Sequence, residues 1–322
     1  MFDKSKERNK MKHNLKITLI LLTMFIVTQF IGLYVVNHYS IEGNTLPYGM
    51  EPPEVEEDIN FYTSFLPSII IAFVIAVMLL ILFTRFKFDF VLKFWFFIVI
   101  LIAIAIFFNS FFPNEKYASL FALIFALPLA ILKVYRRNFL VHNITELIIY
   151  PSIAAVFVPL LNIWTVIILL ILISIYDAWA VWHSGIMQKM AKYQINQLKI
   201  FSGFFIPYIS KKVRMGLKDL PKSELKDKKV KANVAILGGG DVIFPIITAG
   251  VVYLTEKVSL PFGLFPNFAF EGGFWPALFV IIGATLGLSY LFVFAEKKKF
   301  YPAMPFITLG ILLGLAVSII IF

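Results

Sequence analysis

The chain has 322 residues, of which 60% are hydrophobic and only 15% are charged, and its mean hydropathy is +0.87. These values lie outside the range of soluble globular domains and indicate a polytopic membrane protein. The absence of Cys excludes disulfides, thiolate metal sites and a cysteine nucleophile, and four scattered His argue against a histidine metal cluster. The net charge of +10 comes from short blocks between apolar runs, so it indicates membrane topology and not a nucleic-acid surface.

Nine apolar runs are long enough to cross about 30 Å of hydrocarbon, which takes about 20 helical residues. They lie at 15–36, 64–83, 90–111, 117–134, 140–160, 162–182, 232–254, 274–294 and 300–322. The first run follows a basic segment, as a signal peptide does, but it is long and lacks a small-residue cleavage site. We therefore predict an all-α, polytopic transmembrane helix bundle of about nine helices.

Basic residues occur on alternate connections, which predicts that these connections lie on the cytoplasmic side. The connections on the other side are acidic or nearly uncharged, including the stretch at 51–58. The topology therefore places the N-terminus inside and Phe322 outside. The basic residues are Lys4, Lys6, Arg8, Lys10, Lys12, Arg85, Lys87, Lys133, Arg136, Arg137, Lys297, Lys298 and Lys299, with more in the 183–231 connection.

The long basic connection at 183–231 separates helices one to six, at 1–182, from helices seven to nine, at 232–322. Both parts are expected to form one catalytic domain in the membrane. Within the connection, LKIFSGFFIPYI is apolar but too short to span. An interfacial or plugging element suits it, and a solvated linker attracted to anionic lipid suits it equally well.

Three acids lie inside predicted spans, where an ionised side chain costs at least about 2.5 kcal/mol. They are Asp177 in helix six, Asp241 in helix seven and Glu146 in helix five. From the topology, Asp177 lies about 7 Å and Asp241 about 3 Å to the cytoplasmic side of the midplane. The two aspartates therefore fall at nearly the same depth. We expect Glu146, near the inner end of its helix, to be a structural acid.

Two carboxylates that meet in a low-dielectric site cannot both ionise cheaply, so the pair shares a proton. Aspartyl proteolysis needs this state, because the ionised partner takes a proton from the attacking water and the protonated partner donates to the oxyanion. We predict Asp177 and Asp241 as the catalytic pair, with their individual roles left open. No cofactor or metal is expected, since the sequence has no D-x-x-D cluster for Mg²⁺ and no histidine pair at helical spacing for zinc.

Residues beside the pair are candidates for shaping the site. Gly238, Gly239 and Gly240 would each weaken a helix by up to about 1 kcal/mol, which favours close approach of a substrate backbone, although small-residue helix packing also uses glycine. Pro302 and Pro305 interrupt the first turn of helix nine and expose backbone groups, although proline is common at helix starts. Tyr176 could cover the site or simply pack.

Three motifs in chain order carry a resemblance to a known family: YD at 176–177, GGGD at 238–241 for G-x-G-D, and PAMP at 302–305 for P-A-L. Together they resemble the presenilin and signal peptide peptidase family of intramembrane aspartyl proteases. The resemblance implies that Asp177 and Asp241 are catalytic, and that Pro302, Ala303 and Met304 shape the site and engage substrate. Met304 replaces Leu, a swap of similar volume that should be tolerated.

The resemblance also implies partners. An inside N-terminus looks like presenilin, which implies transmembrane or signal-peptide helices with an outside N-terminus as substrates, entering laterally from lipid. Membrane lipids are the other expected partner, and nucleic acid is not. The absence of Cys and the compact loops look like a prokaryotic, archaeal homologue that acts without obligatory accessory subunits. Homo-oligomerisation is left open.

Two alternatives stay open. Type IV prepilin peptidases share G-x-G-D, but they have fewer helices and lack the YD and P-A-L elements. A proton or cation pathway, or a transporter, could use the same intramembrane acids for relay or coordination. The lack of a convincing internal repeat disfavours transporters built from inverted halves.

Overall fold

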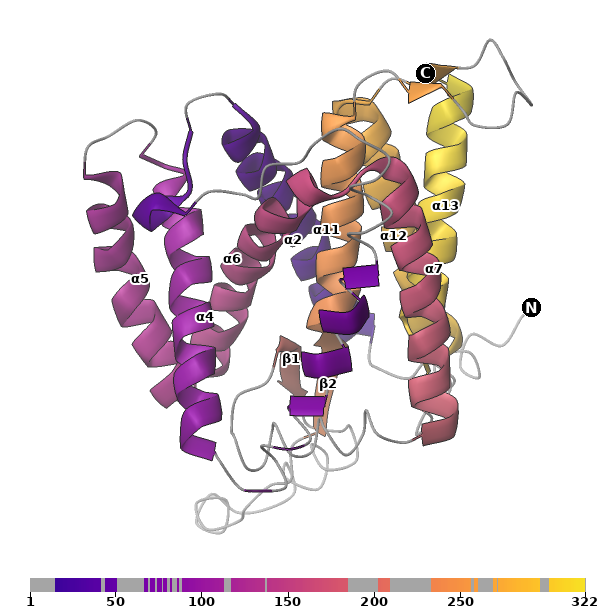
Figure 1. Cartoon of the computed structure of the whole chain (residues 1–322). Coiled ribbons are helices and arrows are strands. Elements are labelled where there is room, and N and C mark those ends of the chain that lie inside the picture. Colours follow the sequence, from indigo (N-terminus) through magenta and orange to yellow (C-terminus); the bar gives the residue numbers. More distant parts are fainter. Residues whose placement is uncertain are drawn as a thin grey trace, which may run out of the picture.

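The computed structural model contains a helical bundle with two short β-hairpins (Figure 1). It describes residues 15–41, 44–50, 89–112, 117–136, 138–184, 202–208, 233–255, 258–259, 269–270, 272–295 and 301–321, and separate helical or turn positions between 67 and 86. The α-helices with defined bounds are α2 (Leu15–Ser40), α4 (Asp89–Asn109), α5 (Ala118–Tyr135), α6 (Phe139–Phe157), α7 (Ile163–Trp179), α11 (Gly239–Leu254), α12 (Phe274–Phe294) and α13 (Met304–Ile321). The predicted class, an all-α membrane bundle, is confirmed.

Seven of the described helices are long and apolar enough to cross a membrane, and α11 is shorter. Most predicted spans agree with these helices to within a few residues. Of the predicted span at 64–83, only separate positions between 67 and 82 are described, and these are helical, whereas most of the 183–231 connection lies outside the residues described. The acidic stretch at 51–58 and most of the basic blocks lie outside them as well, so the predicted orientation stays a prediction.

The helices α6 and α7 begin where short polar side chains cap them. The side chain of Asn138 accepts a hydrogen bond from the N–H of Leu140 at 2.9 Å. Asn162 and Thr165 cap α7 reciprocally, since each side chain accepts the other's backbone N–H, at 2.8 and 2.9 Å. Each cap satisfies amide groups that the first helical turn leaves without intrahelical partners.

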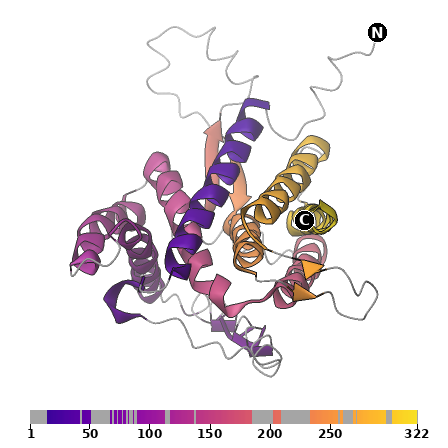
Figure 2. The ribbon, with the colours of Figure 1, turned by 90° about the horizontal axis from the view of Figure 1, so that it is seen from above.

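Hydrogen bonds at the helix ends show how the bundle is joined. The Tyr39 hydroxyl at the end of α2 donates to the carbonyl of Ile106 near the end of α4, at 2.6 Å. The Tyr253 hydroxyl at the end of α11 donates to the Asn37 side chain of α2, at 2.8 Å. In Figure 2, α4 and α5 lie on one side of the molecule, α7, α12 and α13 lie on the other, and α2, α6 and α11 lie between them.

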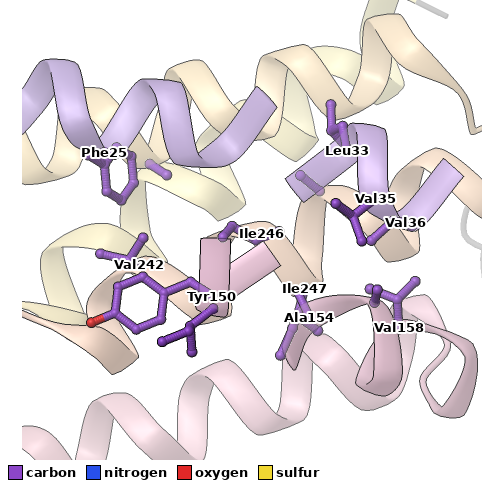
Figure 3. Close-up of a cluster of buried hydrophobic side chains, with 14 of the residues drawn as sticks. Phe25, Leu33, Val35, Val36, Tyr150, Ala154, Val158, Val242, Ile246 and Ile247 are labelled. Atoms are coloured by element: carbon purple, nitrogen blue, oxygen red, sulfur yellow. The ribbon is translucent and has the colours of Figure 1, made fainter. Parts of the chain in front are cut away.

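The core between the two sides is built on α11. Figure 3 shows Phe25 of α2 and Tyr150 of α6 near Val242 of α11, with Ile246 and Ile247 further along the same helix. All five side chains are buried. Apolar packing on both sides therefore determines where the first turn of α11, and with it Asp241, lies.

The prediction of a helix at 232–254 is wrong for its first residues, which form a strand. The expected helix at 232–254 begins only at Gly239, because 233–238 form strand β2 (Asn233–Gly238), which pairs antiparallel with β1 (Gly203–Tyr208). Along β2, exposed Val234 and Ile236 alternate with buried Ala235 and Leu237. An apolar run of this length fits a strand and a helix equally well, so the sequence could not separate them.

The short apolar segment within the 183–231 connection contains β1. It is therefore a strand in the described part, with Phe204 fully buried against the bundle. Its hairpin with β2 lies at the lower end of α11 in Figure 1. Because β2 continues directly into α11, the hairpin and Asp241 are mechanically joined.

Helices α12 and α13 pack at backbone contact. A Cβ placed on Gly283 would overlap the carbonyl of Gly310, and one placed on Gly310 would overlap the carbonyl of Gly283. Glycine is needed at this crossing because no other residue permits so close an approach. The crossing sets the position of α13 relative to the rest of the bundle.

We expect Gly283→Ala to destabilise the protein by about 1–3 kcal/mol, because the added methyl group forces the two backbones apart. Thermal unfolding in detergent measures the change. Leu286→Ala on the same helix is the control, since Leu286 is 64% exposed and its truncation leaves the crossing intact. An equal or smaller loss for Gly283→Ala would contradict the role given to this crossing.

Candidate active site

Asp177 lies near the C-terminal end of α7 and is 7% exposed. The backbone N–H of Met304 donates to its Oδ2 at 3.1 Å. A buried carboxylate needs such a donor, because burial removes its hydrogen bonds to water. The contact links two segments that are 127 residues apart in the sequence.

The donor is available because α13 starts at this point. The N–H of Ile307 donates to the carbonyl of Ala303 at 3.1 Å, which makes Ala303 the residue that caps α13 and Met304 its first residue. The first N–H groups of a helix have no partner within the helix, and they point where its dipole is positive. Pro302 and Pro305 stand on either side, so the donor that this segment presents to Asp177 is the N–H of Met304, at the start of α13.

A second contact joins α7 to α13 one turn before the acid. The hydroxyls of Ser174 and Thr308 lie 2.7 Å apart. Ser174 precedes Asp177 by three residues and Thr308 follows Met304 by four, so each contact involves the same two helix faces. Together they set the register between the two helices.

Asp241 lies in the first turn of α11, directly after the three glycines, and is partly exposed. The next residue, Val242, is fully buried, and its carbonyl accepts a hydrogen bond from the side-chain amide of Gln29 of α2 at 3.2 Å. The N-terminal position lets the dipole of α11 favour negative charge on Asp241. Gln29 and the apolar packing of Val242 hold this turn in place.

The two carboxylates are close enough to interact electrostatically. They come from different helices, Asp177 from the end of α7 and Asp241 from the start of α11, and the start of α13 adds a backbone donor. This arrangement brings together the two acids that the sequence placed at one depth. A pair of this kind can hold one proton between two oxygens and exchange it with a bound water.

The three glycines differ in the space around them. A Cβ on Gly239 would meet the Ser202 hydroxyl at 2.7 Å and the Tyr150 hydroxyl at 3.0 Å. A Cβ on Gly238 would meet the Asp241 carboxylate at 3.1 Å, whereas one on Gly240 would meet only the Phe244 ring at 3.8 Å. Gly238 and Gly239 are therefore needed for close approach at the junction of strand, helix and acid.

Tyr176 occupies the position before the acid, but its side chain is 41% exposed and its ring lies beside Trp179, with centroids 6.4 Å apart. Its predicted part in shaping the site stays a prediction. The ranges described contain no group of three His, Asp or Glu side chains that could hold a metal ion.

A polar cluster at the start of α6 was not predicted as part of the site. Glu146 forms a buried ion pair with Lys133 of α5 at 2.8 Å, and His142 lies 3.5 Å from the same carboxylate oxygen. In the sequence, Lys133 indicated only topology, and Glu146 was expected to be structural. The spacing of His142, Glu146 and Tyr150 at four-residue intervals, which places them on one helix face, is the signal that could have revealed the cluster.

A family model described as signal-peptide peptidase, presenilin aspartyl protease matches residues 19–322. Two solved structures, each described as a presenilin family intramembrane aspartate protease, share the fold. The one in space group C222 has TM-score 0.59 and 20% identity over 95% of this chain and 99% of the other. The one in P2 has TM-score 0.57 and 19% identity over 94% and 98%. No curated protein sequence matches the chain.

We expect Gly239→Ala to destabilise the protein by about 1–3 kcal/mol through its clash with Ser202 and Tyr150. Gly240→Ala should be neutral, or stabilising by up to about 1 kcal/mol, because it adds helix propensity in open space. The two variants differ by one methyl group at adjacent positions. Thermal unfolding of both in one detergent compares them, and equal melting temperatures would refute the packing described here.

Proposed function

The chain belongs to the signal-peptide peptidase and presenilin family of aspartyl proteases, and we propose that it hydrolyses peptide bonds of transmembrane or signal-peptide helices with Asp177 and Asp241. It is an integral membrane enzyme of the aspartic endopeptidase class. The observation that carries the proposal is the meeting of two acids from α7 and α11, within electrostatic range of each other, inside an apolar bundle.

The proposed reaction passes protons through the aspartate pair in both of its steps. A water bound between the carboxylates attacks the scissile carbonyl carbon and gives a proton to the ionised aspartate, while the protonated aspartate donates to the carbonyl oxygen. The tetrahedral intermediate then collapses: the C–N bond breaks, the leaving amine takes a proton from the pair, and one hydroxyl of the intermediate returns a proton to the pair as the carboxylic acid forms. The products are a carboxylic acid and an amine, and the pair again holds one proton.

Each acid has a backbone group that favours its ionised form. The Oδ2 of Asp177 accepts the N–H of Met304, and Asp241 has the backbone of Gly238 and the dipole of α11. Either aspartate can therefore act as the general base toward water, with the other as the partner that donates. The start of α13 thus has a defined part in the reaction, which supports the expectation that the PAMP segment shapes the site.

An extended substrate segment has a place to bind beside the pair. In the described part of the hairpin, β1 and β2 form a two-stranded sheet, and β2 leads through Gly238 and Gly239 to Asp241. A peptide that adds to an exposed strand edge gains main-chain hydrogen bonds without any requirement on its sequence. A helix must unwind locally before its carbonyl can be attacked, and pairing with β2 would stabilise the unwound segment.

The lipid bilayer determines how substrate enters and how the chain is oriented. A hydrophobic helix cannot reach the pair through a charged loop at low cost, so substrate enters laterally from lipid. The basic connections put the N-terminus in the cytoplasm and the C-terminus outside. Substrates with an outside N-terminus fit that topology. Lipids are the other partner, and the proposal needs neither accessory subunits nor a second copy of the chain.

We expect Asp177→Asn and Asp241→Asn each to lower the cleavage rate of a single-span model substrate by at least about 10²-fold, because each removes a general acid or base. Product is measured by mass spectrometry after reconstitution in liposomes. The substitutions are nearly isosteric, so unfolding temperatures should change little. Wild type treated with a transition-state aspartyl protease inhibitor is the matched chemical control.

Equal product from wild type and both Asn variants would refute the protease assignment. Proton or cation flux across the same liposomes tests the rival pathway. That function would show wild-type flux without substrate, and flux would survive at least one of the two substitutions if conduction is passive. Cleavage restricted to a soluble leader peptide next to a span would instead favour a prepilin-peptidase type of enzyme.

We expect Met304→Pro to lower kcat by about 10- to 100-fold, because it deletes the N–H that donates to Asp177, a charge-assisted bond of about 1.5–3 kcal/mol. Proline suits the first residue of a helix, so α13 should form. Met304→Ala is the matched control: it removes the same side chain, which is 3% exposed, but keeps the N–H. The same rate for the two variants would show that packing, not the amide, matters.

A further inference from the structure

Strand β1 has two edges, and only one faces β2. Phe205 uses both of its backbone groups on the other edge: its N–H donates to the Asn143 side chain at 3.1 Å, and its carbonyl accepts from the same side chain at 2.9 Å. The N–H and C=O of one strand residue point to the same side. The amide of Asn143 therefore takes the place that a neighbouring strand would occupy.

His142 closes the same edge two residues earlier. Its Nε2 lies 2.8 Å from the carbonyl of Gly203, which can only accept, so Nε2 carries the hydrogen. The imidazole also packs on the ring of Phe205, with centroids 4.5 Å apart. Two residues further along stands Pro207, which has no N–H to offer a partner strand. Positions 203, 205 and 207, all on the outer edge, are thus capped or lack a donor.

The pairing register of β1 and β2 shows which backbone groups form the outer edge of β2. Since Gly203 and Phe205 face α6, the alternate residues Phe204 and Ile206 exchange hydrogen bonds with their partners on β2, Leu237 and Ala235. The backbone groups of Ile236 and Gly238 then point away from β1. They form the outer edge of β2, the edge that ends at Asp241.

A buried ion pair supports the two capping side chains. Glu146 is 1% exposed, and its Oε1 accepts from Lys133 at 2.8 Å and lies 3.5 Å from Nε2 of His142. The Lys133 ammonium group also donates to Thr145 at 3.1 Å. Removing charges from water opposes folding, so such a pair is weak evidence for stability and better evidence for a specified arrangement. Here it specifies where α6 presents His142 and Asn143.

The hairpin is also tied to the glycines before Asp241. The ring of Tyr150 packs edge-on against Phe204, and its hydroxyl would lie 3.0 Å from a Cβ placed on Gly239. The N–H of Gly239 donates to the carbonyl of Ser202 at 3.4 Å. One face of α6 therefore contacts both the start of β1 and the residue that follows β2, close to Asp241.

We propose that His142 and Asn143 are positioning residues that close the outer edge of β1 and hold the hairpin, so that the β2 edge alone receives substrate and the bond presented to the aspartates is defined. The proposal rests on the proposed proteolytic function. Neither residue touches the reacting atoms. Both act through β1, β2 and the backbone of Gly238, and their loss changes where the substrate is cut.

Asn143→Ala tests the proposal against Asn109→Ala. Asn109 is also buried, and its side-chain amide also donates to a backbone carbonyl, that of Thr45 at 3.1 Å, but it lies at the far end of α4. Both variants lose comparable hydrogen bonds and should lose comparable stability. Only Asn143→Ala should spread cleavage of a model substrate to bonds one or two residues from the main one, and lower the share of the main product at least about twofold.

His142 supplies a second comparison. His142→Gln keeps a side-chain donor for the carbonyl of Gly203, whereas His142→Ala does not. We expect Gln to restore the wild-type cleavage position and Ala to broaden it. A merely structural role would change yield and melting temperature without moving the cleavage position. Wild-type product patterns from both Asn143→Ala and His142→Ala would overturn the proposal.

Hydrogen–deuterium exchange of the full-length protein gives a readout that does not need activity. In Asn143→Ala, amides of 202–208 and 233–238 should exchange about tenfold faster, roughly the effect of one or two lost hydrogen bonds, while those of α12 and α13 stay unchanged. Unchanged protection of these amides would refute the proposal that Asn143 holds the hairpin. A failure of the protease assignment would be seen in the cleavage assay instead, where the amount of product would not depend on Asp177 and Asp241.

Discussion

The structure depends on one contact, the hydrogen bond from the backbone N–H of Met304 to the buried carboxylate of Asp177. An acid in an apolar bundle is tolerated only if something replaces the water that it has lost. The first turn of a helix supplies an amide without adding a charged side chain. The position of α13 is therefore part of the site, and the glycine crossing with α12 and the Ser174–Thr308 contact maintain it.

The second acid is held in a different way. Asp241 follows a strand and three glycines, and its helix turn is held by Gln29 from α2 and by apolar packing around Val242. The acid of α7 lies at the end of its helix and the acid of α11 at the start, so the chain runs in opposite directions through the two helices. The site is thus a meeting point of helix termini. Each terminus leaves backbone groups available, which the middle of a membrane helix does not.

The hairpin extends this arrangement toward the proposed substrate-binding edge. Strands in a lipid environment are tolerated where their edges are satisfied or serve to bind. Side chains of α6 satisfy one edge of β1 and leave the β2 edge beside Asp241. A buried Lys133–Glu146 pair beneath them is costly, but it specifies the arrangement of α6 next to the hairpin. The proposed catalysis and the proposed placement of substrate are then linked through a few backbone hydrogen bonds.

The sequence by itself determined the class of the fold and most helix bounds, and it singled out the two acids as candidates, because hydrophobic length and the cost of a buried charge are local properties that can be read residue by residue. It did not separate strand from helix at 233–238, where a short apolar run suits both. Nor did it reveal that Asn143 and His142 face β1, or that Met304 donates to Asp177. Those contacts join residues 61 to 127 positions apart, and only tertiary packing decides which distant polar groups meet.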